Sequence, residues 1–169
     1  QKNPIILYQF NFEHAGKYLM RLSPLRSQDL PPPNYLCDGL LCYEAYTNGG
    51  TISNCNSHSR RKFFLYDPKA TNHFCTLIVN CYKEIYKNNK FCKEMKMSPE
   101  KRQIYHATHS TGPLEKIELA CQFITSPPDN PSLPELRKKL NLPEYIIPSP
   151  PNSDLHDYGK YVLRRWEAL

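Results

Sequence analysis

The cysteine thiols are the side chains of this sequence with the most chemistry open to them, and all lie in its middle. The seven cysteines fall between positions 37 and 121, at Cys37, Cys42, Cys55, Cys75, Cys81, Cys92 and Cys121. Such clustering is typical of a disulfide framework formed in an oxidising compartment. Seven cysteines allow up to three intrachain disulfides, with the odd one free or bonded to another chain. The pairing cannot be read from the sequence.

Metal binding and catalysis are the other chemistries that cysteine and histidine support, and the spacing favours neither. Structural zinc sites use two close ligand pairs. Cys37 and Cys42 have four residues between them, but Cys75 and Cys81 have five and no second close pair follows. No phosphate-binding glycine loop, Gly-x-Ser-x-Gly elbow or His-Glu-x-x-His motif occurs. We therefore predict no metal, no cofactor and no enzyme, with a cysteine paired to a distant histidine as the remaining enzymatic alternative.

Positive charge is concentrated between residues 60 and 102, which hold eleven basic and four acidic residues. Aromatic residues are interleaved with the basic ones. The favoured contact surface consists of Arg60, Arg61, Lys62, Phe63, Lys83, Lys87 and Lys90. The pattern suits a protein partner with an acidic surface. A solvated face is the simpler alternative, and nucleic acid, bound by phosphate neutralisation and stacking, is the partner we do not expect.

A helix over 72–90 is the clearest element that positions these residues. Asn72 is a suitable N-cap, and apolar residues recur on one stripe at Phe74, Ile78, Cys81 and Ile85. The periodicity places Cys81 on this stripe and Cys75 off it, so the two must reach different parts of the chain.

Further elements follow from apolar spacing, caps and turn residues. We predict helices over 113–124, from Ser132 with a capping box to Glu135, and over 157–169. A short strand over 5–10, a helix over 12–22 and a turn over 47–50 are predicted in the first third. The last helix should use Tyr158, Tyr161, Val162 and Trp166 as its contact face.

Composition sets the fold class. Sixteen prolines and only six glycines in 169 residues indicate stiff, extended connections. We predict a mainly α fold with irregular proline-rich connections, in a single small disulfide-braced domain, with one short β hairpin as an option. Its parts are an N-terminal strand, helix and proline-rich segment over 1–36, a cysteine-rich helical core over 37–125, and a proline-rich arm with short C-terminal helices over 126–169.

The same features suggest a compartment. No run of about 18 apolar residues occurs, so we expect no membrane span. The chain begins at Gln1, as a mature or trimmed terminus would after removal of a signal peptide. Together with the cysteines, this favours a secreted or vesicle-lumenal protein. The alternative is an intracellular scaffold or filament-associated protein with reduced cysteines.

Residues 46–92 resemble the N-terminal cysteine-rich region of the acrosin-binding protein family of sperm. The resemblance is carried by Tyr46, Asn48, Gly50, Cys55, Phe74, Cys75, Cys81 and Cys92. It covers under a third of the chain, and the acidic repeats and long cysteine-rich C-terminal half of that family have no counterpart here. The resemblance implies a protein of the secretory granule or acrosome that binds a protein partner and catalyses nothing.

Overall fold

The computed structural model describes residues 21, 23–25, 27, 29–38 and 50–168, in two compact units, Gln1–Asn54 and Cys55–Leu169. The first unit contains the 3-10 helix η1 (Ser23–Leu25) and the strands β1 (Asn34–Cys37) and β2 (Thr51–Asn54). The two strands pair in parallel, with Asn34 opposite Thr51. A hairpin joins antiparallel strands, so the optional hairpin is not what these strands form. The predicted strand over 5–10, nearly all of the helix over 12–22 and most of the turn over 47–50 lie outside the described residues.

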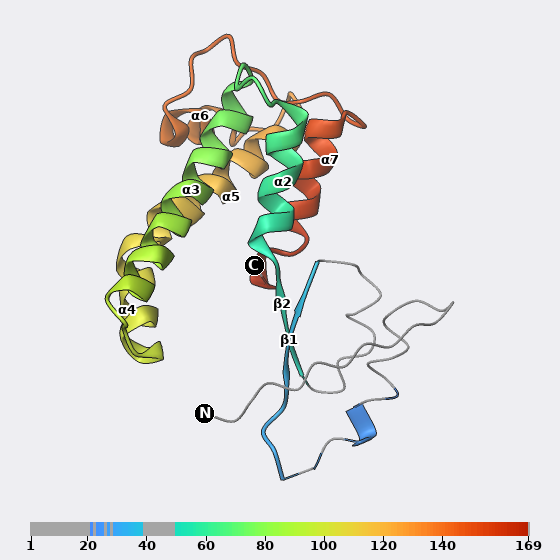
Figure 1. Ribbon diagram of the computed structural model, residues 1–169. Coiled ribbons are helices and arrows are strands. Elements are labelled where there is room, and N and C mark those ends of the chain that lie inside the picture. The colour runs from blue at the N-terminus through green and yellow to red at the C-terminus, as the bar shows by residue number, and fades with distance from the viewer. Residues whose placement is uncertain (1–20, 22, 26, 28, 39–49, 169) are drawn as a thin grey trace. The chain divides into compact units, whose positions relative to one another are not determined.

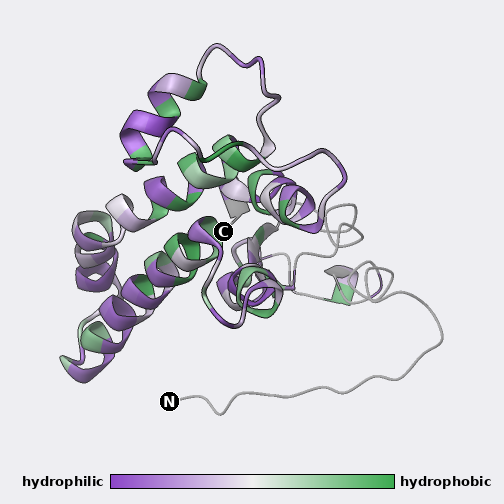
Figure 2. Ribbon diagram, turned by 90° about the horizontal axis from the view of Figure 1, so that it is seen from above, coloured by the Kyte–Doolittle hydropathy of each residue, from purple (hydrophilic) through white to green (hydrophobic). Residues whose placement is uncertain are grey.

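The second unit is built from helices, which confirms the mainly α prediction. They are α2 (Asn56–Tyr66), α3 (His73–Glu94), α4 (Pro99–His109), α5 (Thr111–Thr125), α6 (Leu133–Leu140) and α7 (Asp154–Leu163), followed by the 3-10 helix η3 (Trp166–Ala168). Helix α5 contacts α3, α4, α6 and α7, and α2 packs against α3 and α7 (Figure 1). Hydrophobic and hydrophilic stretches alternate along these helices, as amphipathic packing requires (Figure 2).

Helix α3 begins where the sequence predicted and ends one turn later. The side chain of Asn72 accepts hydrogen bonds from the backbone N–H groups of Phe74 and Cys75, at 3.0 and 3.1 Å. These bonds satisfy two of the donors that a helix N-terminus leaves unpaired. Both Cys75 and Cys81 are buried, so the expectation that Cys75 faces away from the core is wrong. Helix α3 is covered on two sides, by α2 and by α5, and its buried face is therefore wide.

The core runs along α3 and α5 and is closed by α2, α6 and α7. Ile78, Ile117, Phe123, Ile124 and Val162 are completely buried in it. Helices α5 and α7 approach closely at Gly159, where an added Cβ would stand 2.8 Å from the Thr125 Cγ2 methyl. A glycine at this point lets the two helix backbones pack side by side.

The C-terminal third follows the predicted plan with two differences. Helix α6 begins as predicted after Ser132, but the Ser132 side chain makes no capping bond. Instead, the Asn130 side chain accepts from the backbone N–H of Ser132, at 2.9 Å. The last helix starts earlier than predicted, at Asp154, and ends at Leu163. The 3-10 helix η3 covers most of the remaining residues. Tyr158, Tyr161 and Trp166 pack against the core, as the expected contact face requires.

The cysteines do not form the predicted disulfide brace. Within the described residues there is no disulfide, and six cysteines are free thiols, at Cys37, Cys55, Cys75, Cys81, Cys92 and Cys121. Cys42 lies outside that part of the chain. Four of the six thiols are buried and serve as small apolar side chains of the second unit. Their clustering in the sequence reflects helices that contribute to one core, and so does not require an oxidising compartment.

Candidate functional site

A hydrogen bond between Ser57 and Tyr86 joins the first turn of α2 to the middle of α3. The two hydroxyl oxygens are 3.1 Å apart. Residues three or four apart lie on the same side of a helix. Arg60 and Arg61 therefore follow Ser57 on one side of α2, while Lys83 and Lys90 flank Tyr86 on α3. Cations from two helices are brought together around this contact.

We call this surface the α2–α3 basic face. It consists of Arg60, Arg61, Lys83, Lys87 and Lys90, five of the seven side chains predicted as a contact surface. Arg61 and the three lysines are exposed, and Arg60 is half-buried. Helix α2 contains no acidic residue. On α3, Lys90 approaches Glu94 at 3.7 Å in an exposed pair, which weakens the charge of the face only slightly. Glu84 is also exposed on α3, but the five cations outnumber the carboxylates beside them and the face is positive.

The Arg60 guanidinium is held against the helix. Its central carbon lies 5.3 Å from the centre of the Phe64 ring, and its Nε atom is buried with no hydrogen-bond partner among the described residues. Phe64 remains 44% exposed. A guanidinium that stacks on an aromatic ring keeps its outer N–H groups free to donate. This arrangement presents an oriented cation and an exposed ring at the same place.

The other two predicted residues lie elsewhere. Phe63 is completely buried and packs edge-to-face against Tyr158, with ring centres 6.1 Å apart. The Lys62 ammonium group lies over the rings of Tyr161 and Tyr158, at 4.4 and 5.4 Å from their centres. Both side chains therefore belong to the packing of α2 against α7. Residues 60–63 point in different directions because they are helical, and no helix was predicted there.

The helical hairpin of α3 and α4 extends the positive surface. The Arg102 guanidinium on α4 donates to the Asn89 side chain on α3, at 2.7 Å. The Asn88 side chain donates to the backbone oxygen of His109, at 3.0 Å. These bonds fix α4 along the second half of α3. Exposed lysines continue beyond Lys90 at Lys93, Lys96 and Lys101. The sequence showed these charges, but the helix that carries the last of them was not predicted.

The thiols differ in reactivity because their surroundings differ. Burial raises the pKa of the Cys75 thiol to about 12, and also raises the pKa of the Cys121 thiol. Cys55, at the start of α2, has a lowered pKa, because the His58 side chain and the backbone N–H groups of Ser57 and His58 hydrogen-bond to it. A neighbouring histidine or a helix N-terminus activates a cysteine as a nucleophile, and Cys55 is the described cysteine whose surroundings most resemble these. Within the described ranges, no three side chains of His, Cys, Asp or Glu lie together as metal ligands.

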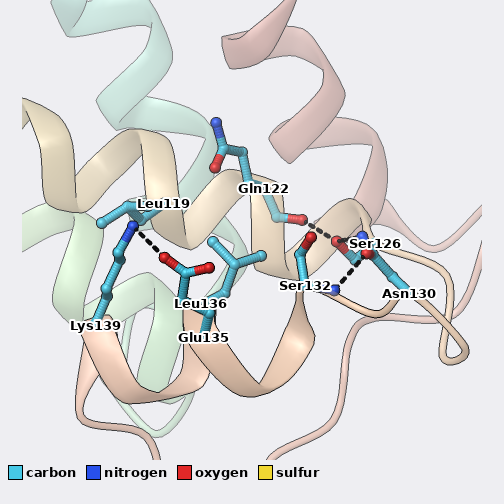
Figure 3. Close-up of a pocket in the computed structure, with 8 residues that line it drawn as sticks. All are labelled: Leu119, Gln122, Ser126, Asn130, Ser132, Glu135, Leu136 and Lys139. Atoms are coloured by element: carbon cyan, nitrogen blue, oxygen red, sulfur yellow. Dashed lines mark hydrogen bonds and ion pairs between the residues drawn. The ribbon is translucent and has the colours of Figure 1, made fainter.

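Apart from the basic face, the structure has a concave site between α5 and α6 (Figure 3). It has a volume of about 380 Å³ and is lined by Leu119, Gln122, Ser126, Asn130, Ser132, Glu135, Leu136 and Lys139. Its polar groups pair with one another. The Asn130 amide donates to the Ser126 hydroxyl at 2.9 Å, and Lys139 contacts Glu135 at 2.8 Å. The first bond lies in the connection from α5 to α6 and the second within α6, and both engage polar groups that a ligand would need, so the site is less suited to a ligand than the basic face.

None of the helices that the structure describes has the length and apolar character to cross a membrane.

Comparison with known proteins places the chain in a family. The model of the transposase IS66 family matches residues 1–169, the whole of the sequence. No curated protein and no solved structure matches the chain.

The family match corrects several predictions. The resemblance to the acrosin-binding protein family is wrong, and so are the secreted or acrosomal location and the acidic protein partner that went with it. Transposases act on DNA, so the exclusion of nucleic acid is wrong too. A transposase family also points to an enzyme, against the prediction of no activity. The alternative prediction was an intracellular scaffold or filament-associated protein with reduced cysteines, and its location and reduced cysteines agree better with the family and the free thiols than the prediction of a secreted protein does. The chain belongs to the transposase IS66 family.

Proposed function

We propose that this chain binds DNA through the α2–α3 basic face, as part of a protein that carries out transposition. The observation that carries the proposal is the gathering of Arg60, Arg61, Lys83, Lys87 and Lys90 around the Ser57–Tyr86 contact. The family supplies the partner, and the face supplies the means of binding it.

The physics of DNA binding suits such a face. Each cation that neutralises a phosphate releases a counterion that had condensed on the duplex, and this release favours binding. Exposed lysines on α3 can approach a phosphate backbone without moving the helix. Arg60 has a more fixed position because it stacks on Phe64, and a fixed guanidinium can donate two hydrogen bonds to one phosphate. Such contacts position a protein on DNA and do not read its sequence.

The proposal concerns binding, the step that this face can perform. If the α2–α3 basic face served only to keep the protein soluble, its charges would be interchangeable with those elsewhere on the surface. In a DNA interface, a charge that contacts a phosphate contributes more to the affinity than a charge elsewhere on the surface. The difference can be measured, because helix α6 offers an exposed lysine of the same type at Lys138.

The test is the salt dependence of binding to a fluorescein-labelled duplex, followed by fluorescence anisotropy with the full chain. Replacing one phosphate-contacting lysine should reduce the slope of log affinity against log salt by about 0.9. We expect this reduction for Lys87→Ala and for Lys83→Ala. The matched variant Lys138→Ala should leave the slope unchanged.

Two outcomes would contradict the proposal. One is a wild-type chain that shows no salt-dependent affinity for the duplex. The other is an equal loss for Lys87→Ala and Lys138→Ala, which would mean that only the net charge of the chain matters.

A further inference from the structure

Helix α4 presents an unusual surface, because none of its residues is buried. One side of it carries a pocket of about 270 Å³, lined by Met97, Lys101, Ile104, Tyr105, Thr108 and His109. We call this site the α4 pocket. Its lining is largely apolar, and Ile104 is 68% exposed. The Ile104 side chain is therefore not stabilised by burial in the core of the protein.

Aromatic rings stand in a row beside the pocket. The Tyr105 ring lies between those of Phe91 and His109, with centres 5.2 Å from the first and 4.2 Å from the second. The angles between the ring planes are 31° and 35°, so neighbouring rings are closer to stacked than to perpendicular. Phe91 is 40% exposed. The row therefore offers further planar groups a surface on which to stack.

The size of the α4 pocket restricts its occupant. Pockets for drug-sized ligands have volumes of about 300–1,000 Å³, and the α4 pocket falls just below this range. It therefore suits a single planar ring system and is too small for a folded protein segment.

The charge around the pocket restricts the occupant further. Lys101 lines the pocket itself, and exposed lysines at Lys93 and Lys96 lie on the neighbouring end of α3 and the turn that follows it. Lys90, immediately before Phe91, belongs to the α2–α3 basic face. A chain of phosphates that lies along α3 would thus reach the α4 pocket past four exposed lysines and two exposed carboxylates, those of Glu94 and Glu100. A planar ring attached to a negatively charged backbone fits both features.

We propose that the α4 pocket receives an unpaired base of DNA, with the exposed His109 ring, backed by Tyr105, providing the stacking surface and Lys101 a contact to the adjoining phosphate. The inference rests on the proposed DNA-binding function and narrows its substrate class to DNA that is single-stranded or locally unpaired. Proteins that bind single strands combine a positive groove with aromatic rings in this way. A base within an intact duplex cannot enter the site, because its faces are already stacked.

The test uses the full chain and two fluorescein-labelled probes, an oligothymidylate single strand and a fully paired duplex. His109→Ala should weaken single-strand binding by roughly 5-fold to 150-fold, the range that loss of one base–aromatic stack produces. His109→Phe should preserve binding, because it keeps an aromatic ring. Gln103→Ala, at an exposed position of the same helix, is the matched control. Because α4 buries no side chain, circular dichroism should show the fold of all three variants intact.

The outcomes separate this inference from the proposed function. Loss of single-strand binding in His109→Ala, with duplex binding intact, supports the α4 pocket. Unchanged single-strand binding in His109→Ala overturns it, even if Lys87→Ala still weakens the duplex complex. Should Ile104→Ala abolish self-association in sedimentation equilibrium and leave both DNA affinities unchanged, the pocket is a contact between copies of the chain and the inference is wrong. If wild type binds neither probe, the proposed function fails first.

Discussion

The close approach of α5 and α7 at Gly159 can be tested by adding a single methyl group. In Gly159→Ala the new Cβ would stand 2.8 Å from the Thr125 Cγ2 atom, 3.3 Å from Ile124 Cγ2 and 3.4 Å from the Cys121 carbonyl oxygen. The first of these separations is shorter than van der Waals contact allows, so either Thr125 or the whole of α7 must move.

The loss of stability in Gly159→Ala depends on how strongly the neighbouring side chains resist that movement. Thr125 is β-branched, and its hydroxyl donates to the Cys121 carbonyl at 2.9 Å, so rotating its methyl away breaks a hydrogen bond worth about 1 kcal/mol. Overpacking of a buried site costs about 1–3 kcal/mol. Alanine also favours the helix over glycine by roughly 0.5–1 kcal/mol. The free energy of unfolding should therefore fall by about 1–2 kcal/mol.

Gly112 provides the matched control. It lies in the first turn of α5, and among the described residues no atom beyond the backbone of its own helix comes within 4 Å of the position that a Cβ would take. Gly112→Ala should therefore gain up to about 1 kcal/mol of helix propensity. Urea denaturation followed by circular dichroism measures both changes through the transition midpoint. Opposite signs are expected for the two variants. If Gly159→Ala stabilises the protein as much as Gly112→Ala does, α5 and α7 do not pack as closely as this reasoning requires.

Four other experiments test individual features of the structure. Asn72→Ala should cost about 1 kcal/mol in urea denaturation, because it removes the side-chain cap of α3; an unchanged midpoint would contradict the cap. Burial and the charge of Arg102 lower the pKa of His106, so the folded state binds fewer protons than the unfolded state. Stability present above the ordinary histidine pKa of about 6.5 should then decline as the pH falls through it, and His106→Gln should flatten that decline. The lowered pKa of Cys55 predicts alkylation at lower pH than an unperturbed thiol, and His58→Ala should move the reaction to higher pH. All six described thiols should be alkylated in denaturant without reductant, and a requirement for reductant would show that they are bonded.

The helices that the sequence predicted are those that contribute most to the core. Helices α3 and α5 carry long apolar stripes, and the Asn72 cap is a strong local signal, so their positions followed from periodicity. Helices α2 and α4 were not predicted, and they contribute little to the core. Helix α2 buries only Ser59 and Phe63, and α4 buries nothing. The few buried residues of α2 leave no apolar stripe to recognise, whereas α4 has a local start signal, the Ser98 cap followed by Pro99 and Glu100, which a search for apolar periodicity does not use.

The proposed contact surface was only partly predictable for the same reason. Charge density indicated the segment that carries it, and five of the seven residues fall on one face. Separating Lys62 and Phe63 from Arg60 and Arg61 requires knowing that the segment is helical and that α7 lies against it. For the cysteines the error was to predict disulfide bonds where the described thiols are free. Spacing in the sequence cannot distinguish thiols that meet as bonded pairs from thiols that fill one core, because both produce a cluster.

A helix that lends no side chain to the interior is also a helix on which replacements carry little thermodynamic penalty. Surface changes away from caps and buried contacts usually alter stability by less than about 0.5 kcal/mol. The exposed positions of α4 outside its hydrogen bonds to α3, through Arg102 and the His109 carbonyl, can therefore change while α3 and α5 stay as they are. This separates the part of the molecule that must be preserved for folding from a part whose sequence is freer to change.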